Sequence, residues 1–160
     1  MFTYTTYYNS PLGLIKISGS NSAVNAISFI DAVDEPENTT DVLKDCTQQL
    51  QQYFAGTLKT FAVAIVTEGT AFQQQVWQQV QQIPFGDTCS YGDVALQLQN
   101  ETASRAVGAA NGKNPIAIII PCHRVIAANG DLTGYAWGMQ RKHWLLAHEQ
   151  KFAKGIQTLF

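Results

Sequence analysis

Cysteine is scarce in this chain of 160 residues, which contains only Cys46, Cys89 and Cys122. An odd number of widely spaced cysteines argues against a disulfide framework and fits the reducing cytoplasm. The sequence also lacks Cys-x-x-Cys and His-x-x-x-His pairs, which are common spacings of zinc ligands. We therefore expect no structural metal and no bound cofactor.

Long apolar runs are missing as well. No run approaches the length of a transmembrane helix, and residues 1–4 have neither the basic start nor the apolar core of a signal peptide. Charged residues make up only 14% of the chain, whereas 46% is hydrophobic, which is enough for a packed core. We expect a folded cytoplasmic protein without membrane contact, built as one domain or two small ones.

Charge is unevenly divided although the net charge is only −2. Residues 1–100 carry three basic and nine acidic side chains, a net charge of −6, and residues 101–160 carry seven basic and three acidic ones, a net charge of +4. A local basic patch is enough to hold phosphates, so the second part could bind nucleic acid despite an acidic pI. Ordinary surface charge explains the same numbers.

The N-terminal part predicts an antiparallel meander. Residues 2–8, 12–18 and 24–30 read as strands, because they are rich in aromatic and β-branched side chains, the first two alternate with polar ones, and turn-forming residues separate them. One more strand is expected over residues 61–66. The polar segment 68–70 then marks the boundary between a domain of residues 1–68 and a second of residues 69–160.

A helix is expected between the meander and that last strand. Asp41 is placed to cap its N-terminus, and Gly56 is placed to end it. Its apolar face consists of Leu43, Cys46, Leu50, Tyr53 and Phe54. Cys46 is therefore interpreted as a core residue.

The second domain has a helical pattern. Thr70 can cap a first helix, and two short helices follow over residues 91–98 and 103–111, separated by a polar break. Two short helices around a tight turn are typical of a helix-turn-helix. The second of them consists largely of small residues, and Arg105 is its only long side chain. Such a helix can enter a DNA groove with one cation, or pack tightly against a neighbour, and composition favours neither.

The sequence Pro121-Cys122-His123-Arg124 follows an apolar run over residues 116–120 that predicts a buried strand ended by the proline. A thiol, an imidazole and a guanidinium are thereby crowded at one strand exit. A neighbouring imidazole or cation lowers the pKa of a cysteine and makes it nucleophilic. The alternative is that Cys122 is a buried core residue without chemical function. We favour the interpretation of Cys122 as a reactive cysteine.

An ordered set of motifs resembles the O6-alkylguanine-DNA alkyltransferases, also called methylated-DNA–protein-cysteine methyltransferases. The set covers residues 70–150 densely, and its members are Phe72-x-x-x-Val76-Trp77, Ile83-Pro84-x-Gly86, Ser90-Tyr91-Gly92, Arg105-Ala106-Val107-Gly108, Asn114-Pro115, Pro121-Cys122-His123-Arg124-Val125, Gly134-Tyr135 and Lys142-x-x-Leu145-Leu146-x-x-Glu149. The resemblance implies an α+β fold: an N-terminal antiparallel sheet with a helix, ribonuclease H-like, and a C-terminal helical domain with a winged-helix-like helix-turn-helix.

The activity implied by the resemblance is DNA repair by direct reversal. The alkyl group of O6-alkylguanine would move irreversibly to Cys122, so each molecule acts once, and O4-methylthymine stays open as a second lesion. His123 would take the thiol proton through a water, Glu149 would orient His123, and Asn114 would brace the turn. The partner would be double-stranded DNA containing the lesion, bound by a monomer.

The same resemblance implies how the base is reached. The nucleotide must be flipped out of the duplex after binding in the minor groove, and Arg105 would fill the gap in the stack. The other residues implied to contact DNA are Ala103, Ser104, Ala106, Gly108 and Arg124. The base pocket would be lined by Tyr91, which donates to the base, and by Val125, Tyr135, Ala136 and Trp137.

One departure from the family pattern concerns pocket size. Trp137 occupies a position where many relatives have glycine, so we expect a narrow pocket that accepts methyl and disfavours benzyl groups.

Three other functions compete with this interpretation. A DNA-binding relative that only recognises alkylguanine would lack the cysteine that this chain keeps. A transcription regulator would require a basic, base-reading helix and would leave Cys122, His123 and Glu149 without a role. A cysteine hydrolase would require an oxyanion hole, which no motif indicates.

Overall fold

A computed structural model of the protein describes residues 3–132 and 134–155. The chain forms two units, of which the first ends at Thr67 and also includes Pro115–Ala117. The predicted boundary after residue 68 lies one residue beyond Thr67. Residues 115–117, which the sequence assigned to the second domain, are bound to the first unit by backbone hydrogen bonds: Ile27 donates to Pro115 at 3.0 Å, and Ala117 donates to Ile27 at 3.0 Å.

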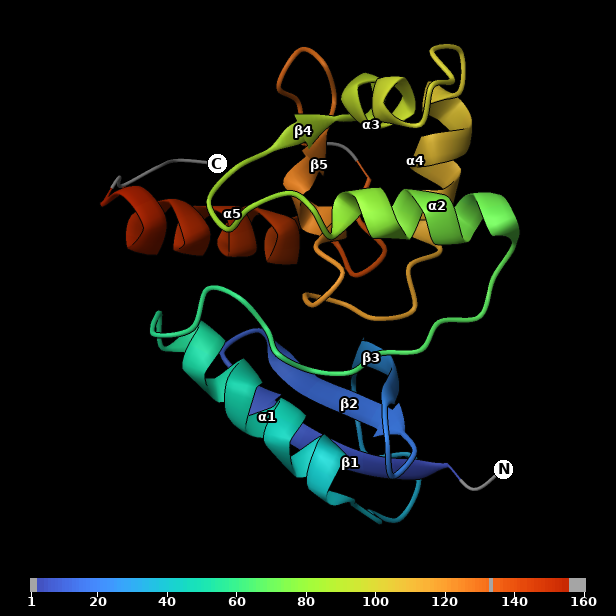
Figure 1. Cartoon of the computed structure of the whole chain (residues 1–160). Coiled ribbons are helices and arrows are strands. Elements are labelled where there is room, and N and C mark those ends of the chain that lie inside the picture. The colour runs from blue at the N-terminus through green and yellow to red at the C-terminus, as the bar shows by residue number, and fades with distance from the viewer. Residues whose placement is uncertain (1–2, 133, 156–160) are drawn as a thin grey trace. The chain divides into compact units, whose positions relative to one another are not determined.

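The first unit is a three-stranded antiparallel sheet, in the order β1 (Tyr4–Ser10), β2 (Gly13–Gly19) and β3 (Val24–Ile30), with helix α1 (Asp41–Phe54) lying along it (Figure 1). The predicted meander and helix are confirmed, although residue 2 lies outside the described residues. Ile15 and Ile17 of β2 are fully buried, as alternation requires. The five predicted apolar residues of α1 are all buried.

Two predictions in this unit are wrong. Thr40, not Asp41, is the N-cap of α1, because the backbone at Thr40 is extended and its hydroxyl accepts a hydrogen bond from the Leu43 amide. The strand expected over residues 61–66 is absent except for an isolated bridge between Val24 and Ile65. The side-chain amide of Gln49 hydrogen-bonds both the N–H and the C=O of Ala62, so these groups are not available for a ladder.

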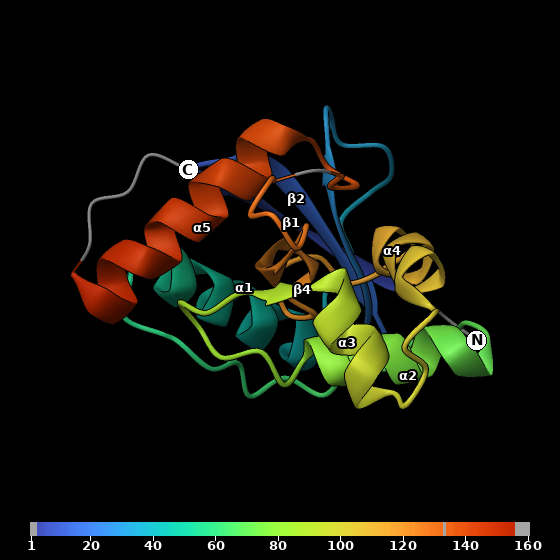
Figure 2. The same cartoon turned by 90° about the horizontal axis from the view of Figure 1, so that it is seen from above.

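The second unit contains four α-helices among its described residues, α2 (Ala71–Val80), α3 (Tyr91–Gln97), α4 (Ser104–Gly112) and α5 (Met139–Lys154). Thr70 caps α2 as predicted, in a reciprocal capping box with Gln73. The Trp77 indole of α2 donates to the Ala110 carbonyl at 2.9 Å, which anchors the C-terminal part of α4. Helices α3 and α4, the two short helices of the predicted helix-turn-helix, lie side by side (Figure 2).

The predicted strand over residues 116–120 is not present. Ile116 forms only an isolated bridge with Ile27, and the residues after it are in turns. Ile118, which is buried, has a φ of 71°. A β-branched residue rarely adopts this conformation, and it costs on the order of 1–3 kcal/mol. The run is apolar because it is buried, and its backbone turns back toward the 3-10 helix η1 (Cys122–Arg124). After η1, the short strand β5 (Val125–Ile126) pairs in parallel with β4 (Cys89–Ser90).

No helix in the described part of the chain combines the length and the apolar character that crossing a membrane requires.

The cap of α1 provides a matched test of the corrected boundary. We expect Thr40→Ala to lower the free energy of unfolding by about 1 kcal/mol, because the Leu43 amide loses its acceptor. Asp41→Ala removes only a favourable charge in the first turn and is expected to cost about half as much or less. Urea denaturation of both variants measures the difference, and a larger loss for Asp41→Ala would contradict the assignment.

Candidate active site around Cys122

Cys122 begins η1 directly after Pro121 and is 2% exposed. Two asparagines hold its turn. Asn114 lies with Nδ2 3.2 Å from Cys122 Sγ and donates to the Ile120 carbonyl at 2.8 Å. Asn111, in the last turn of α4, donates from Nδ2 to the carbonyl of Cys122 at 3.2 Å. The thiol is therefore fixed by its surroundings at the backbone and at the sulfur.

The electrostatics of the thiol are set by burial and by one lysine. Burial raises the pKa of Cys122 to about 11, against the opposing effects of the Asn114 hydrogen bond and the positive charge of Lys142. Lys142 is fully buried, and its Nζ donates to the carbonyl of Val125 at 2.7 Å and to that of Gly134 at 3.3 Å. Burial lowers the pKa of Lys142 to about 8. At neutral pH the thiol thus keeps its proton until a base removes it.

Glu149 of α5 supplies the buried carboxylate next to that base. His123 Nε2 lies 2.7 Å from Oε2, and Arg124 donates to both carboxylate oxygens, from Nε at 2.7 Å and from Nη2 at 3.0 Å. The Gly86 amide donates to Oε1 at 3.3 Å. Burial alone would raise the pKa of Glu149, but the hydrogen bonds of His123 and Arg124 and the charge of Arg124, joined at low pH by that of the protonated His123 ring, hold it well below the ordinary value. Glu149 is therefore ionised.

The protonation of His123 follows from its partner. Burial lowers the pKa of His123, and Glu149 only partly opposes this, so the imidazole is neutral at pH 7. An ionised carboxylate only accepts hydrogen bonds, so we infer that the single ring proton of His123 resides on Nε2. The lone pair of Nδ1 is then available to take a proton. This is the arrangement in which a carboxylate orients a histidine as a base.

Arg124 does not have the environment that its predicted contact with DNA requires. Its side chain is 7% exposed, and besides the two bonds to Glu149 it donates from Nη1 to the Ile83 carbonyl at 2.7 Å. Its guanidinium also lies over the ring of Phe85. With these partners inside the protein, the guanidinium supports Glu149, and its contact with DNA stays a prediction. The sequence pattern could not distinguish the two uses of an arginine.

Unpaired polar atoms gather at the same place. Three buried side-chain atoms have no hydrogen-bond partner among the residues described: Asn111 Oδ1, His123 Nδ1 and Tyr135 OH. Asn111 binds the Cys122 carbonyl, His123 follows Cys122 in sequence, and the ring of Tyr135 meets that of His123 edge-on at 6.5 Å. Each unpaired buried group costs about 1–3 kcal/mol, so their concentration around one thiol indicates a functional site.

Aromatic rings frame this site. Tyr135 and Trp137 meet edge-on with ring centroids 5.4 Å apart. Tyr91 begins α3 and packs its ring against Gly108, where an added Cβ would lie 3.8 Å from two ring carbons. Burial raises the pKa of the Tyr91 hydroxyl, and so does the charge of Cys122. Tyr91 therefore remains a hydrogen-bond donor at neutral pH.

The remaining predicted residues differ in accessibility. Val125 is fully buried in β5, whereas Ala136 is exposed. On α4, the side chains of Arg105 and Ala106 are exposed and Ser104 is half-buried. Ala103, the N-cap of α4, is buried. The exposed surface of this helix is thus narrower than the sequence suggested.

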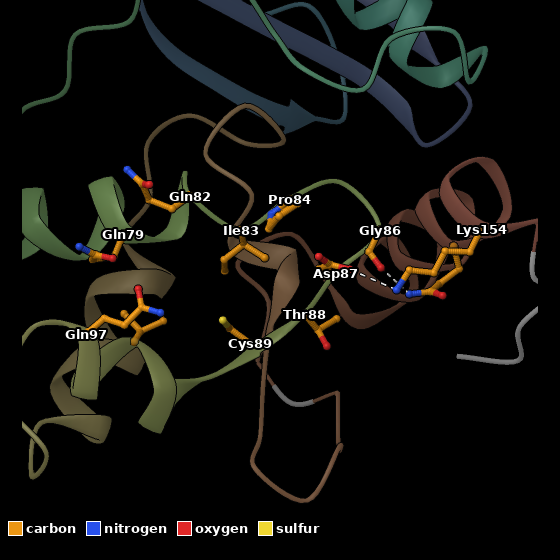
Figure 3. A pocket seen from close by; sticks show the side chains of 12 residues that line it. Gln79, Gln82, Ile83, Pro84, Gly86, Asp87, Thr88, Cys89, Gln97 and Lys154 are labelled. Carbon is orange, nitrogen blue, oxygen red and sulfur yellow. Dashed lines mark hydrogen bonds and ion pairs between the residues drawn. The ribbon is translucent and has the colours of Figure 1, made fainter.

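A separate cavity of about 450 Å³ lies between α2, α3, the segment 83–89 and α5, and its lining includes Gln79, Gly86, Cys89, Gln97 and Lys154 (Figure 3). None of the predicted site residues lines it. Gly86, in the wall of this cavity, has a φ of 88°. An added Cβ at this residue would lie 2.5 Å from the Cβ of Ala153. Gln150 donates to the Gly86 carbonyl at 2.7 Å, so both backbone polar groups of Gly86 are bound by α5.

Sequence reasoning gave no role in the site to three residues that the structure places there: Lys142 and Gly86, which were quoted only as motif members, and Asn111. Lys142 lies seven residues before Glu149, and this spacing puts both on one face of a helix, so its position could have been inferred. Asn111 looks like an ordinary residue near a helix end. Gly86 looks like an ordinary turn residue. Their roles depend on tertiary contacts that no local pattern encodes.

Comparisons with known proteins point to one family for both units of the chain. Residues 3–67 match the ribonuclease-like domain of 6-O-methylguanine DNA methyltransferase, and residues 71–151 match the DNA binding domain of the same family. A methylated-DNA–protein-cysteine methyltransferase from Methanosarcina acetivorans is 44% identical over 91% of this chain and 97% of its own. The O6-methylguanine methyltransferase of Mycobacterium tuberculosis superposes with a TM-score of 0.87 at 41% identity, covering 97% of both chains. A structure of Mycobacterium tuberculosis OGT in complex with DNA gives a TM-score of 0.85 at 41% identity, covering 94% of this chain and 93% of that one.

The buried carboxylate makes a prediction for stability. We expect Glu149→Gln to lower the free energy of unfolding at pH 7 by about 3–5 kcal/mol, because Arg124 stays buried without a counter-charge. The pKa of Glu149 is depressed in the folded state, so its stabilising effect is present above the unfolded value of about 4.3 and is lost at lower pH. The difference between wild type and Glu149→Gln should therefore shrink below about pH 4.

Asp87→Asn is the matched control, because Asp87 forms a surface ion pair with Lys154 at 3.1 Å and both side chains are about half exposed. Its cost should be about 1 kcal/mol or less. Chemical denaturation at several pH values measures both variants. Equal losses for the two would contradict the buried network.

Proposed function

This chain belongs to the 6-O-methylguanine DNA methyltransferase family, and on that premise we propose that it repairs DNA by transferring the alkyl group of O6-alkylguanine to Cys122. The observation that carries the assignment to Cys122 is the set of unpaired polar atoms on Asn111, His123 and Tyr135 around one buried thiol. A thiolate is a strong, soft nucleophile, which displacement at an alkyl carbon requires.

The first step is activation of the thiol. His123 Nδ1 takes the proton of Cys122 through a water, while Nε2 stays bonded to Glu149. The ionised carboxylate then stabilises the imidazolium that forms, and Lys142 and the Asn114 amide stabilise the thiolate. Arg124 and Gly86 hold Glu149 in place throughout. The pKa raised by burial therefore does not prevent reaction, because base and nucleophile are adjacent.

The second step is the displacement. The thiolate attacks the alkyl carbon, an S–C bond forms, and the C–O6 bond breaks with its electron pair going to the guanine. Tyr91 donates a hydrogen bond to the departing base, and the proton that His123 took from the thiol returns by way of water to the base, so that guanine, a thioether and neutral His123 are the products. A thioether on a buried cysteine is not reversed, and each molecule acts once.

DNA binding is assigned to α4 through the minor groove. The lesion must leave the duplex to reach a thiol that is 2% exposed, and flipping a nucleotide costs a few kcal/mol. Arg105, exposed on α4, fills the gap left in the stack, and the small Ser104 and Ala106 allow the helix to approach closely. Contacts to phosphate and to groove shape suffice, because repair must be independent of sequence.

A cytoplasmic location and a monomeric state complete the proposal. Cys46, Cys89 and Cys122 are all free, and a reducing compartment keeps the acceptor thiol from being oxidised. One chain carries both the helix-turn-helix and the acceptor, so no second copy is required for the reaction.

Label transfer tests the assignment. An oligonucleotide with radiolabelled O6-methylguanine should pass one label per molecule to the wild-type protein and none to Cys122→Ala, because the nucleophile is then absent. Cys89→Ala is the control and should transfer like wild type. Label on the Cys122→Ala protein would refute the assignment, and tight binding of lesion DNA without transfer by the wild type would identify a sensor instead. The same assay with O4-methylthymine decides whether that lesion is accepted.

Trp137 makes a prediction about lesion size. Its ring packs on Tyr135 beside the site, so a benzyl group should be crowded, and wild type should react with O6-benzylguanine DNA about tenfold or more slowly than with O6-methylguanine DNA. Trp137→Gly should narrow that ratio, whereas Trp137→Phe should keep most of it. Single-turnover rates measure this, and equal wild-type rates for the two lesions would show that Trp137 does not limit the pocket.

A further inference from the structure

Asn111 makes one contact that links two parts of the proposed machinery. It lies in the last turn of α4, 4% exposed, and its Nδ2 donates to the backbone carbonyl of Cys122 at 3.2 Å. This partner determines the orientation of the Asn111 side-chain amide, because the Cys122 carbonyl oxygen can only accept a hydrogen bond and the amide donates only from Nδ2. The helix assigned to DNA is thereby bonded directly to the residue that carries the nucleophile.

Helix α4 couples the position of Arg105 to that of Asn111. Arg105 and Asn111 are six residues apart, which corresponds to about 9 Å along a helix. The Trp77 indole binds the carbonyl of Ala110, next to Asn111, and fixes this end of α4 to α2. The part of α4 from Arg105, which is exposed, to Asn111, which is buried, is thus one rigid element.

The other half of the Asn111 amide explains why the donor matters. Its Oδ1 is buried and has no hydrogen-bond partner among the residues described. Such a group costs about 1–3 kcal/mol, and a leucine of similar size would avoid the cost. An asparagine kept under these conditions indicates that its donor serves the site, as unsatisfied groups at functional sites often do.

We propose that Asn111 is a positioning residue that aligns Cys122 with the DNA held on α4. This role rests on the proposed function and is distinct from that of Asn114, which contacts the sulfur itself. The hydrogen bond of Asn111 is to the backbone of Cys122, so it sets where the turn lies rather than how acidic the thiol is. Its loss leaves DNA binding intact and lowers the rate of transfer once DNA is bound.

Single-turnover transfer from an O6-methylguanine duplex separates these quantities. For Asn111→Leu, the rate constant at saturating DNA falls about tenfold, because a small misplacement of a nucleophile has a large effect on rate. The DNA concentration at half-saturation stays within about twofold of wild type, since no DNA contact is lost. A merely structural role would lower the melting temperature and leave the rate constant at saturation unchanged.

Asn25→Leu is the matched control, because Asn25 is exposed on β3 in the other unit, and it reacts like wild type. Asn111→Asp is the second variant, which keeps the size of the side chain but removes the hydrogen-bond donor. It slows transfer at least as much as Asn111→Leu does. Asn25→Asp controls for its added charge. The second variant also decides the matter if Asn111→Leu fails to fold.

The two proposals fail in different ways. The role of Asn111 would be overturned if the rate constant of Asn111→Asp at saturating DNA stayed within twofold of wild type. It would also be overturned if only the DNA concentration at half-saturation changed. Wild-type protein that places no label on Cys122 would instead overturn the proposed function.

Discussion

An ionised carboxylate buried inside a protein is costly, and the second unit is arranged around one. Glu149 sits on α5 at 1% exposure and is reached by His123 and Arg124 of η1 and by the Gly86 amide. Desolvating such a charge costs several kcal/mol, which only close and multiple hydrogen bonds offset. The same contacts that offset this cost also fix three chain segments together. The contact that helps to stabilise the carboxylate also orients the His123 ring.

The turn that carries Cys122 is also held by two asparagines, one in the last turn of α4 and one just after that helix. Asn114 reaches the sulfur and Asn111 the carbonyl of Cys122, while the chain between them and η1 passes through the first unit at residues 115–117. Ile118 turns with a positive φ as the chain leaves that unit. Backbone strain of this kind persists only where surrounding contacts determine the conformation. Cys122 is therefore placed by contacts to both sides of a constrained turn, rather than by a regular element.

Local patterns were sufficient for much of the fold and for part of the site. The alternation in residues 12–18, the apolar face of α1 and the cap at Thr70 are local properties, and each was predicted from the sequence. The strand over residues 116–120 was not correct, because burial rather than extension explains its apolar side chains. The hydrogen bonds between Arg124 and Glu149 were not predicted either, since no local pattern indicates that a carboxylate 25 residues away is brought to this guanidinium. Resemblance identified Glu149 itself, which composition alone would have left as a surface charge.

The close approach between Gly86 and Ala153 ties two distant positions into one steric unit. Because an added Cβ at residue 86 would lie only 2.5 Å from the Ala153 Cβ, a larger side chain at either position would clash with the other. A φ of 88° restricts residue 86 further, since side chains other than glycine are strained there. Any larger residue at either position would push α5 away from the segment that donates to Glu149. The residues allowed at position 153 of α5 are therefore limited by the contact with Gly86 that holds Glu149 in place.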